Sequence, residues 1–165
     1  MPPVLPCAAL NAEALAAFVA HQGMQLTWVE EGQAIPGSYW GEPEAGIIGA
    51  RLYVRRDTPV HSLLHELGHW RCMDPERRAI VDTDACGTDT EENAVCYLQA
   101  LLADRIPGYS RERLLADMDA WGYHFILGSA RAWFEQDSDD ARGFLQRHGL
   151  LDADGALTGR LRLTP

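Results

Sequence analysis

The segment that decides the fold is Thr58-Pro-Val-His-Ser-Leu-Leu-His-Glu-Leu-Gly-His-Trp-Arg-Cys72. Thr58 followed by Pro59 is a typical helix start, with the hydroxyl as cap and the proline at the first helical position. Asp74-Pro75 follows the segment, and a proline at this place favours a helix end just before it. The sequence therefore predicts a helix from Thr58 to about Cys72.

This predicted helix carries His65-Glu66-Leu-Gly-His69. Residues four apart lie on one helix face, about 6 Å apart along the axis, so both imidazoles can bind one metal ion with Glu66 beside them. Zinc lowers the pKa of a bound water to about 7, and a neighbouring glutamate can then take the water's proton. The spacing predicts His65 and His69 as zinc ligands and Glu66 as the general base.

A catalytic zinc needs a third protein ligand and one open position. A helix predicted from Glu91 to about Asp104 offers two adjacent glutamates, Glu91 and Glu92. Glu91 shares its face with an apolar stripe that is expected to pack against the first helix, whereas the face of Glu92 is more polar. We therefore predict Glu91 as the third ligand and Glu92 as a solvated neighbour. The residues on the Glu91 face are Ala94, Val95, Leu98 and Leu102, and those on the Glu92 face are Cys96, Gln99 and Ala103.

Upstream of the motif, helical spacing of apolar residues predicts a helix from Asn11 to about Gln22, with Asn11 as N-cap and Gly23 as the C′ residue. Residues 25–30 alternate like a strand, and a loop rich in Gly and Pro follows.

Residues Ile47 to Arg55 predict a second strand, which we expect to pair antiparallel with the first. Downstream, periodicity predicts helical structure from Ser110 to about Gly149, with breaks near Gly128 and Ser138. These elements indicate one α+β domain over residues 1–165. A small antiparallel or mixed sheet would pack on the active-site helix, with further helices toward the C-terminus.

Composition excludes several classes of protein. The chain has 165 residues and 47% apolar residues, which favours a single domain with a packed core. Fourteen basic residues against 24 acidic ones give a formal charge of −10, so nucleic acid is an unfavourable partner. All basic residues are Arg, as is common in GC-rich bacterial genomes.

No apolar run approaches the ~20 residues of a membrane span, and the four cysteines follow no disulfide pattern. Because the N-terminus also lacks the features of a signal peptide, we expect a soluble cytoplasmic protein.

The motifs resemble the HExxH zincins of the gluzincin kind, in which a later helix supplies a Glu followed three residues on by Ala. His65-Glu-Leu-Gly-His69 and Glu91-x-x-Ala94 match that pattern. Tyr97 and Leu101-Leu102 fall where small ImmA/IrrE-like peptidases carry an aromatic residue and a Leu pair, and the motif with Trp70 is similar to ArdC-type antirestriction proteins. The resemblance covers about forty residues. It implies a zincin-like fold, and zinc bound by His65, His69 and Glu91 with Glu66 as general base. In zincins the strand before the active-site helix often forms the cleft edge, so a peptide would add to strand 47–55.

One position departs from related families, which often carry Asp or Asn four residues after the ligand Glu, where this chain has Val95. A side chain that orients a ligand histidine must then come from elsewhere. The candidates in the preceding acidic loop are Asp82, Asp84 and Asp89.

Other residues have open roles. His61 lies one turn before His65 and is expected to be structural or to line a substrate cleft. Cys72 is a weaker candidate for a soft ligand. Oxyanion stabilisation in zincins often uses Tyr or His. The candidates here are Tyr123 and His124 on a predicted third helix, and Tyr109 in a turn.

Together these features predict a zinc-dependent metallopeptidase that hydrolyses a flexible segment of a peptide or protein. An alternative from another class is a zinc-bearing regulatory or antirestriction protein that binds a partner without turnover. Substitution of Glu66 separates the two, because binding would survive it and hydrolysis would not.

Overall fold

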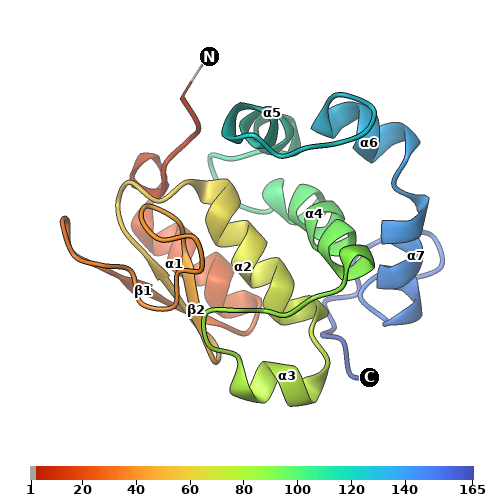
Figure 1. The fold of residues 1–165 in the computed structure, drawn as a ribbon, viewed down its shortest axis with the longest axis horizontal. Coiled ribbons are helices and arrows are strands. Elements are labelled where there is room, and N and C mark those ends of the chain that lie inside the picture. The colour runs from red at the N-terminus through yellow and green to blue at the C-terminus, as the bar shows by residue number, and fades with distance from the viewer. Residues whose placement is uncertain (1–2) are drawn as a thin grey trace.

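The computed structural model describes residues 3–165 and has an α+β fold (Figure 1). Within these residues, seven α-helices and a three-stranded sheet account for the regular structure, apart from a short 3₁₀ turn at Cys7–Ala9. The strands are β1 (Gln25–Trp28), β2 (Gly46–Ile48) and β3 (Arg51–Val54). The helices are α1 (Ala12–His21), α2 (Val60–Cys72), α3 (Pro75–Ile80), α4 (Asp89–Ala103), α5 (Arg111–Trp121), α6 (Ala130–Gln136) and α7 (Asp139–Arg147).

The sheet is mixed, with strand order β1-β3-β2. β1 pairs parallel with β3, and β2 pairs antiparallel with it, so that Leu52 lies between Leu26 and Ile47. The prediction of one strand over residues 47–55 is wrong. Gly49, at a φ of +57°, turns the chain after β2, and β3 returns beside it. The expected antiparallel pairing with residues 25–30 is also wrong, because the strand that adjoins β1 runs in the same direction as β1.

The outer edge of β2 is covered by the chain that follows α3. Gly49 N–H donates to the Val81 carbonyl at 2.8 Å, and Thr83 N–H donates to the Ile47 carbonyl at 2.9 Å. β3 is paired on both sides. The prediction that a peptide adds to strand 47–55 is therefore wrong, because residues 81–83 already occupy that position.

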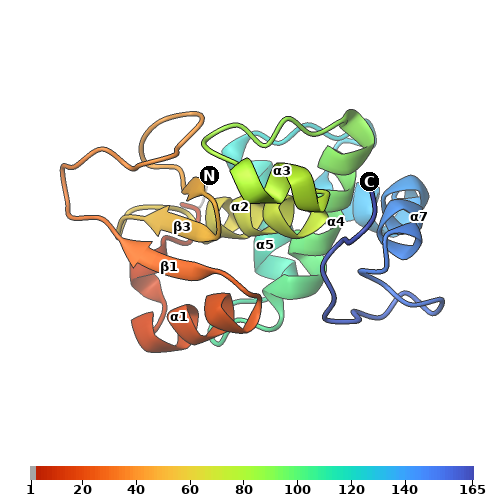
Figure 2. The ribbon, with the colours of Figure 1, turned by 90° about the horizontal axis from the view of Figure 1, so that it is seen from below.

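Helix α2 lies at the centre of the molecule, between the sheet and α4 (Figures 1 and 2). It packs on β2 and β3, while α1 packs against β1. Every residue of α2 is buried except His65 and Glu66, and the fully buried Leu63, Leu64 and Leu67 contribute to the main core. The fold thus leaves one short stretch of this helix open, and that stretch is the first two residues of the motif, His65 and Glu66.

The ends of the N-terminal helices follow local sequence rules, with one exception. Asn11 caps α1 by accepting a hydrogen bond from Ala14 N–H at 2.9 Å, and Gly23 has a φ of +96°, both as predicted. α2 ends at Cys72, also as predicted. However, the N-cap of α2 is Pro59, because the Thr58 hydroxyl accepts from Arg55 N–H at 2.9 Å instead and closes the preceding turn.

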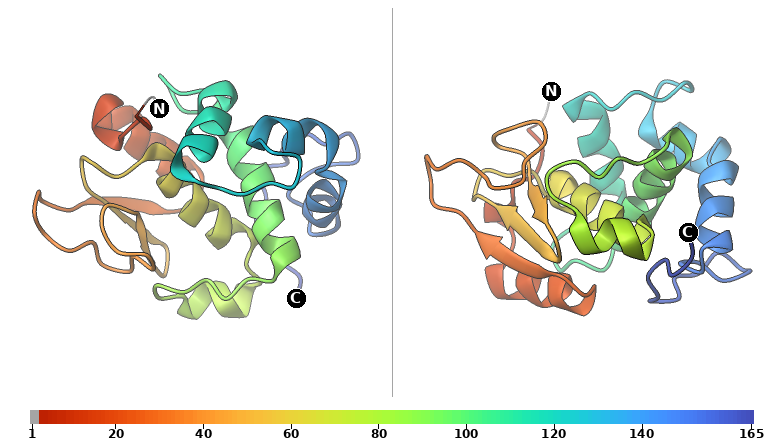
Figure 3. Two further views of the ribbon diagram at one scale, coloured as in Figure 1. Left: turned by 45° about the horizontal axis from the view of Figure 1, so that its top comes forward. Right: turned by 60° about the horizontal axis from the view of Figure 1, so that its bottom comes forward.

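The C-terminal half is helical, as expected, but its first break comes earlier. α5 ends at Trp121, and Gly122 at a φ of +101° leads into a loop that runs to Ser129. Tyr123 and His124 therefore lie in a loop rather than on a helix. α4 is enclosed by α2, α5 and α7 (Figure 3). No helix in residues 3–165 combines the length and apolar character that crossing a membrane requires.

Candidate metal centre

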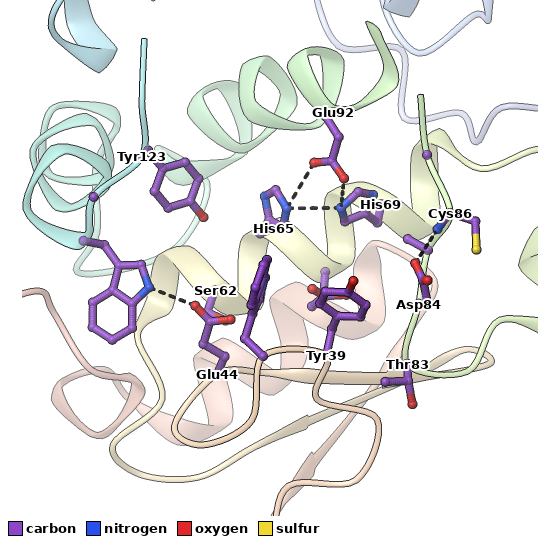
Figure 4. A pocket seen from close by; sticks show the side chains of 16 residues that line it. Tyr39, Glu44, Ser62, His65, His69, Thr83, Asp84, Cys86, Glu92 and Tyr123 are labelled. Atoms are coloured by element: carbon purple, nitrogen blue, oxygen red, sulfur yellow. Dashed lines mark hydrogen bonds and ion pairs between the residues drawn. The ribbon is translucent and has the colours of Figure 1, made fainter. Parts of the chain in front are cut away.

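Three side chains from two helices converge on one point (Figure 4). His65 and His69 come from α2 and Glu92 comes from α4. The two Nε2 atoms are 3.1 Å apart, and the Glu92 carboxylate oxygens lie 3.5 Å from His65 Nε2 and 3.2 Å from His69 Nε2. The helices thus bring together the two motif histidines and one acidic residue from a separate part of the chain.

The spacing of these atoms fits a tetrahedral zinc ion. Ligand atoms bound at about 2.0–2.1 Å to a tetrahedral centre lie about 3.3 Å from one another. The distance of 3.1 Å between the two Nε2 atoms is close to that value, and each imidazole has one Glu92 oxygen at a similar distance, Oε2 at 3.5 Å from His65 and Oε1 at 3.2 Å from His69. Two histidines and one carboxylate are also the protein ligands of a known class of catalytic zinc site, which leaves a fourth position open.

The orientation of the His65 ring supports the same interpretation. His65 Nδ1 lies 2.9 Å from Gln99 Oε1, while Gln99 Nε2 donates to the His61 carbonyl at 2.8 Å. With the amide oxygen at hydrogen-bond distance, Nδ1–H donates to Gln99, and Nε2 is the ring nitrogen that faces His69 and Glu92. A ring nitrogen held in this position, facing a second imidazole and a carboxylate, is well placed to bind a cation between them.

Glu91, the predicted third ligand, lies elsewhere. Its carboxylate is buried, and Arg77 Nη1 donates to it at 2.8 Å, with a second contact from Nη2 at 3.1 Å. Gly87 lies against it, and a β-carbon on this glycine would be only 3.3 Å from the Glu91 carboxyl group. The prediction is therefore corrected at this position: the glutamate that lies against His65 and His69 is Glu92, and Glu91 anchors α3 and the following loop.

The error has a physical cause in the surroundings of α4. This helix packs against three others, so apolar residues cover most of its circumference and do not single out the face toward α2. The face that meets the histidines instead carries Glu92 and Gln99, two turns apart. Two polar residues seven positions apart on a buried helix are the sequence signal that could have identified this face.

The close approach of α2 and α4 depends on Gly68. A β-carbon at this position would lie 2.9 Å from Val95 Cγ1. Gly68 therefore lets α4 come near enough for Glu92 to reach the imidazoles. Val95 fills the space over this glycine.

Glu66 lines a cavity of about 570 Å³ that opens onto the three converging side chains. It is one residue along from His65 and, unlike Glu92, is not one of the converging groups. Its removal from bulk water raises the pKa of the Glu66 carboxyl to about 7. A carboxyl with a pKa near neutrality is well matched to accept and release a proton.

Tyr123 is the predicted oxyanion candidate that lies at the cavity. Its hydroxyl is 3.3 Å from His61 Nδ1, and its ring centroid is 6.0 Å from that of His65. His61 itself is fully buried, so it supports Tyr123 rather than lining the cleft. His124 is exposed outside the cavity lining, and the Tyr109 hydroxyl donates to buried Asp117 at 2.9 Å. The latter two are thus placed away from the site.

The remaining candidates do not meet the histidines. Asp84 lines the cavity, but its carboxylate accepts a hydrogen bond from Cys86 N–H at 2.9 Å. Asp82 contacts the Thr83 hydroxyl, and Asp89 begins α4. Gln99 takes the orienting position that we expected one of these aspartates to fill. Cys72 is fully buried outside the converging group, and burial raises the pKa of its thiol.

Comparison of the chain with protein-family models, with curated proteins and with solved structures found no match.

Proposed function

We propose that this protein is a zinc-dependent metallopeptidase with a zincin-like arrangement of its catalytic groups. The observation that supports this most strongly is the convergence of His65 Nε2, His69 Nε2 and the Glu92 carboxylate within 3.5 Å of one another, with Glu66 beside them on the only open part of α2. Structural zinc sites are closed by four protein ligands, whereas here three candidate ligands open onto a cavity that the Glu66 carboxyl also lines, as a hydrolytic site requires.

His65, His69 and Glu92 would hold the zinc ion. When bound there, zinc supplies a Lewis acid and lowers the pKa of a coordinated water to about 7. Gln99 fixes the His65 ring by accepting from Nδ1–H, which keeps Nε2 directed at His69 and Glu92.

Glu66 acts as the proton carrier. Its carboxylate takes a proton from the attacking water as the water oxygen bonds to the peptide carbonyl carbon. The same carboxyl then delivers that proton to the amide nitrogen as the C–N bond breaks, and the products are a carboxylate and an amine. The Tyr123 hydroxyl, held near His61 at the cavity wall, donates a hydrogen bond to the oxygen that becomes negatively charged.

Substitution of Glu66 by Gln tests this function. The variant should bind about one zinc per chain, as the parent does, because Glu66 is not a ligand. Its rate of peptide hydrolysis should fall by at least about 100-fold, because the amide cannot accept the proton. Zinc is measured by atomic absorption and cleavage by mass spectrometry of a peptide library.

A variant that cleaves as fast as the parent would refute the peptidase mechanism. The alternative, a zinc protein that binds a partner without turnover, predicts that neither protein cleaves any library member while both retain zinc.

A further inference from the structure

The rim of the cavity carries three aromatic side chains that are exposed to solvent. Tyr39 and Trp40 lie on the loop between β1 and β2, with 55% and 78% of their surface exposed, and Trp121 ends α5 with 39% exposed. Tyr39 and Trp40 are in edge-to-face contact, with ring centroids 5.0 Å apart. Large aromatic groups gathered at the mouth of a cavity indicate a surface that receives a ligand.

The loop that carries Tyr39 and Trp40 is held by polar contacts on both sides of these residues. The buried Arg55 guanidinium donates to the Gln33 carbonyl at 2.9 Å and to Glu42 at 2.7 Å, which fixes the loop on both sides of Tyr39 and Trp40. On the other side of the cavity mouth, Trp121 Nε1–H donates to Glu44 Oε1 at 2.8 Å. This bond joins the loop to α5 and gives the Trp121 ring and the Glu44 carboxylate defined positions.

The charge of the cavity is negative. Its lining includes four carboxyl groups and no arginine, and the chain has no lysine. Glu92 and Glu66 belong to the metal centre and its proton transfer, which leaves Glu44 and Asp84. In residues 3–165 neither of these two forms an ion pair with a basic side chain, although Glu42 on the same loop does. In Figure 4, Glu44 lies on the opposite side of the histidines from Glu92.

The combination of rings and carboxylate discriminates between ligands. A purely apolar side chain would suit the rings, but it would remove water from the half-buried Glu44 carboxylate without replacing its hydrogen bonds, which is unfavourable. An acidic side chain would be repelled. Arginine and lysine have an alkyl stem and a cation, and they can satisfy both the ring faces and the carboxylate.

We propose that this part of the cavity binds an arginine or lysine side chain of the substrate. Its alkyl stem lies against Trp40 and Trp121, and its charged head group contacts both the ring faces and the Glu44 carboxylate. The inference deepens the proposed peptidase function, on which it rests for the reaction after binding. It names the substrate class as a flexible peptide segment with a basic residue close to the bond that is cleaved.

Binding tests the inference without turnover. Zinc-loaded Glu66→Gln protein is titrated with a fluorescein-labelled peptide of about ten residues, made of Ala, Gly and Ser with one central Arg, and with the same peptide carrying citrulline, the neutral analogue of Arg. The Arg peptide should bind about tenfold more tightly, as expected for one cation–π contact and one partly desolvated ion pair. Adding Glu44→Gln, which keeps an oxygen for Trp121 Nε1–H, should remove the share of the difference that comes from the ion pair and leave only the smaller share from the cation–π contact. Glu31→Gln, on the same loop but outside the cavity lining, should retain the full difference.

Equal affinity for the two peptides, or no measurable binding of the Arg peptide at millimolar concentration, would overturn the inference. Cleavage of the same peptides by the parent protein tests the proposed function separately. Arg-selective binding without cleavage would support this inference and contradict the proposed peptidase function. Cleavage without any preference for Arg would support the peptidase function and contradict this inference.

Discussion

Glu91 and Glu92 are chemically identical neighbours, and their different surroundings predict opposite effects of the same substitution. Glu92→Gln should weaken zinc binding by at least about tenfold, because a neutral amide replaces the anionic group that lies 3.2 Å from His69 Nε2. Glu91→Gln should leave zinc affinity nearly unchanged. It should instead lower the free energy of unfolding by about 1–3 kcal/mol, because it weakens the buried bond to Arg77.

Chelator competition measures the zinc affinities and urea unfolding of the zinc-free proteins measures stability. A larger loss of zinc affinity in the Glu91 variant than in the Glu92 variant would return the third ligand to Glu91.

Gln99 is the residue that orients His65, and its role is separable from bulk packing. Gln99→Ala should weaken zinc binding by about 10–100-fold, because the His65 ring loses the acceptor for Nδ1–H. Gln99→Glu should restore most of that affinity, since a carboxylate also accepts from Nδ1–H, even though it loses the bond to the His61 carbonyl. If both variants lose zinc equally, Gln99 serves only to pack α4 against α2.

At the scale of elements, the site depends on how closely α2 and α4 approach each other. Gly68→Ala would place a β-carbon 2.9 Å from Val95 Cγ1, and a valine in a helix has essentially one χ1 rotamer, so the helices must separate. Glu92 would then move away from the histidines, and zinc affinity should fall by about tenfold. Thermal stability is a poor readout here, because alanine also gains about 1 kcal/mol in helix propensity over glycine.

The double variant Gly68→Ala with Val95→Ala provides the control, measured by the same chelator competition. It removes the methyl groups that the new β-carbon would meet, and should recover most of the lost affinity. Failure of the double variant to recover zinc binding would mean that helix separation is not the cause.

The sequence predicted the elements whose signals are local. The Asn11 cap, Gly23 and the end of α2 before Asp74-Pro75 follow from residues a few positions apart, and the structure has them where they were expected. The motif on α2 was placed correctly for the same reason, because helix spacing alone puts His65 and His69 on one face.

The predictions that failed depend on contacts between distant segments. The face of α4 depends on which three helices enclose it, and the sheet order depends on a crossover that no residue pattern encodes. Tyr123 reaches the cavity only because α5 ends at Trp121, before the break expected near Gly128. Long-range packing therefore determines which acidic residue lies against the two histidines and which residues line the cavity. Local sequence determines the helix that carries the motif.

At the scale of the whole molecule, zinc binding should stabilise the folded state. Its proposed ligands lie on α2 and α4, which α3 and the acidic loop separate along the chain, so an ion that binds them ties the two helices together in the folded state only. Folded-state stability should then rise by about 4 kcal/mol when free zinc is about 1,000 times the dissociation constant, which corresponds to an increase of about 10 °C in Tm. Scanning calorimetry with added zinc and with a chelator measures this shift. His65→Ala together with His69→Ala should show the same Tm under both conditions, and a zinc-dependent Tm in that double variant would place the ion at a different site.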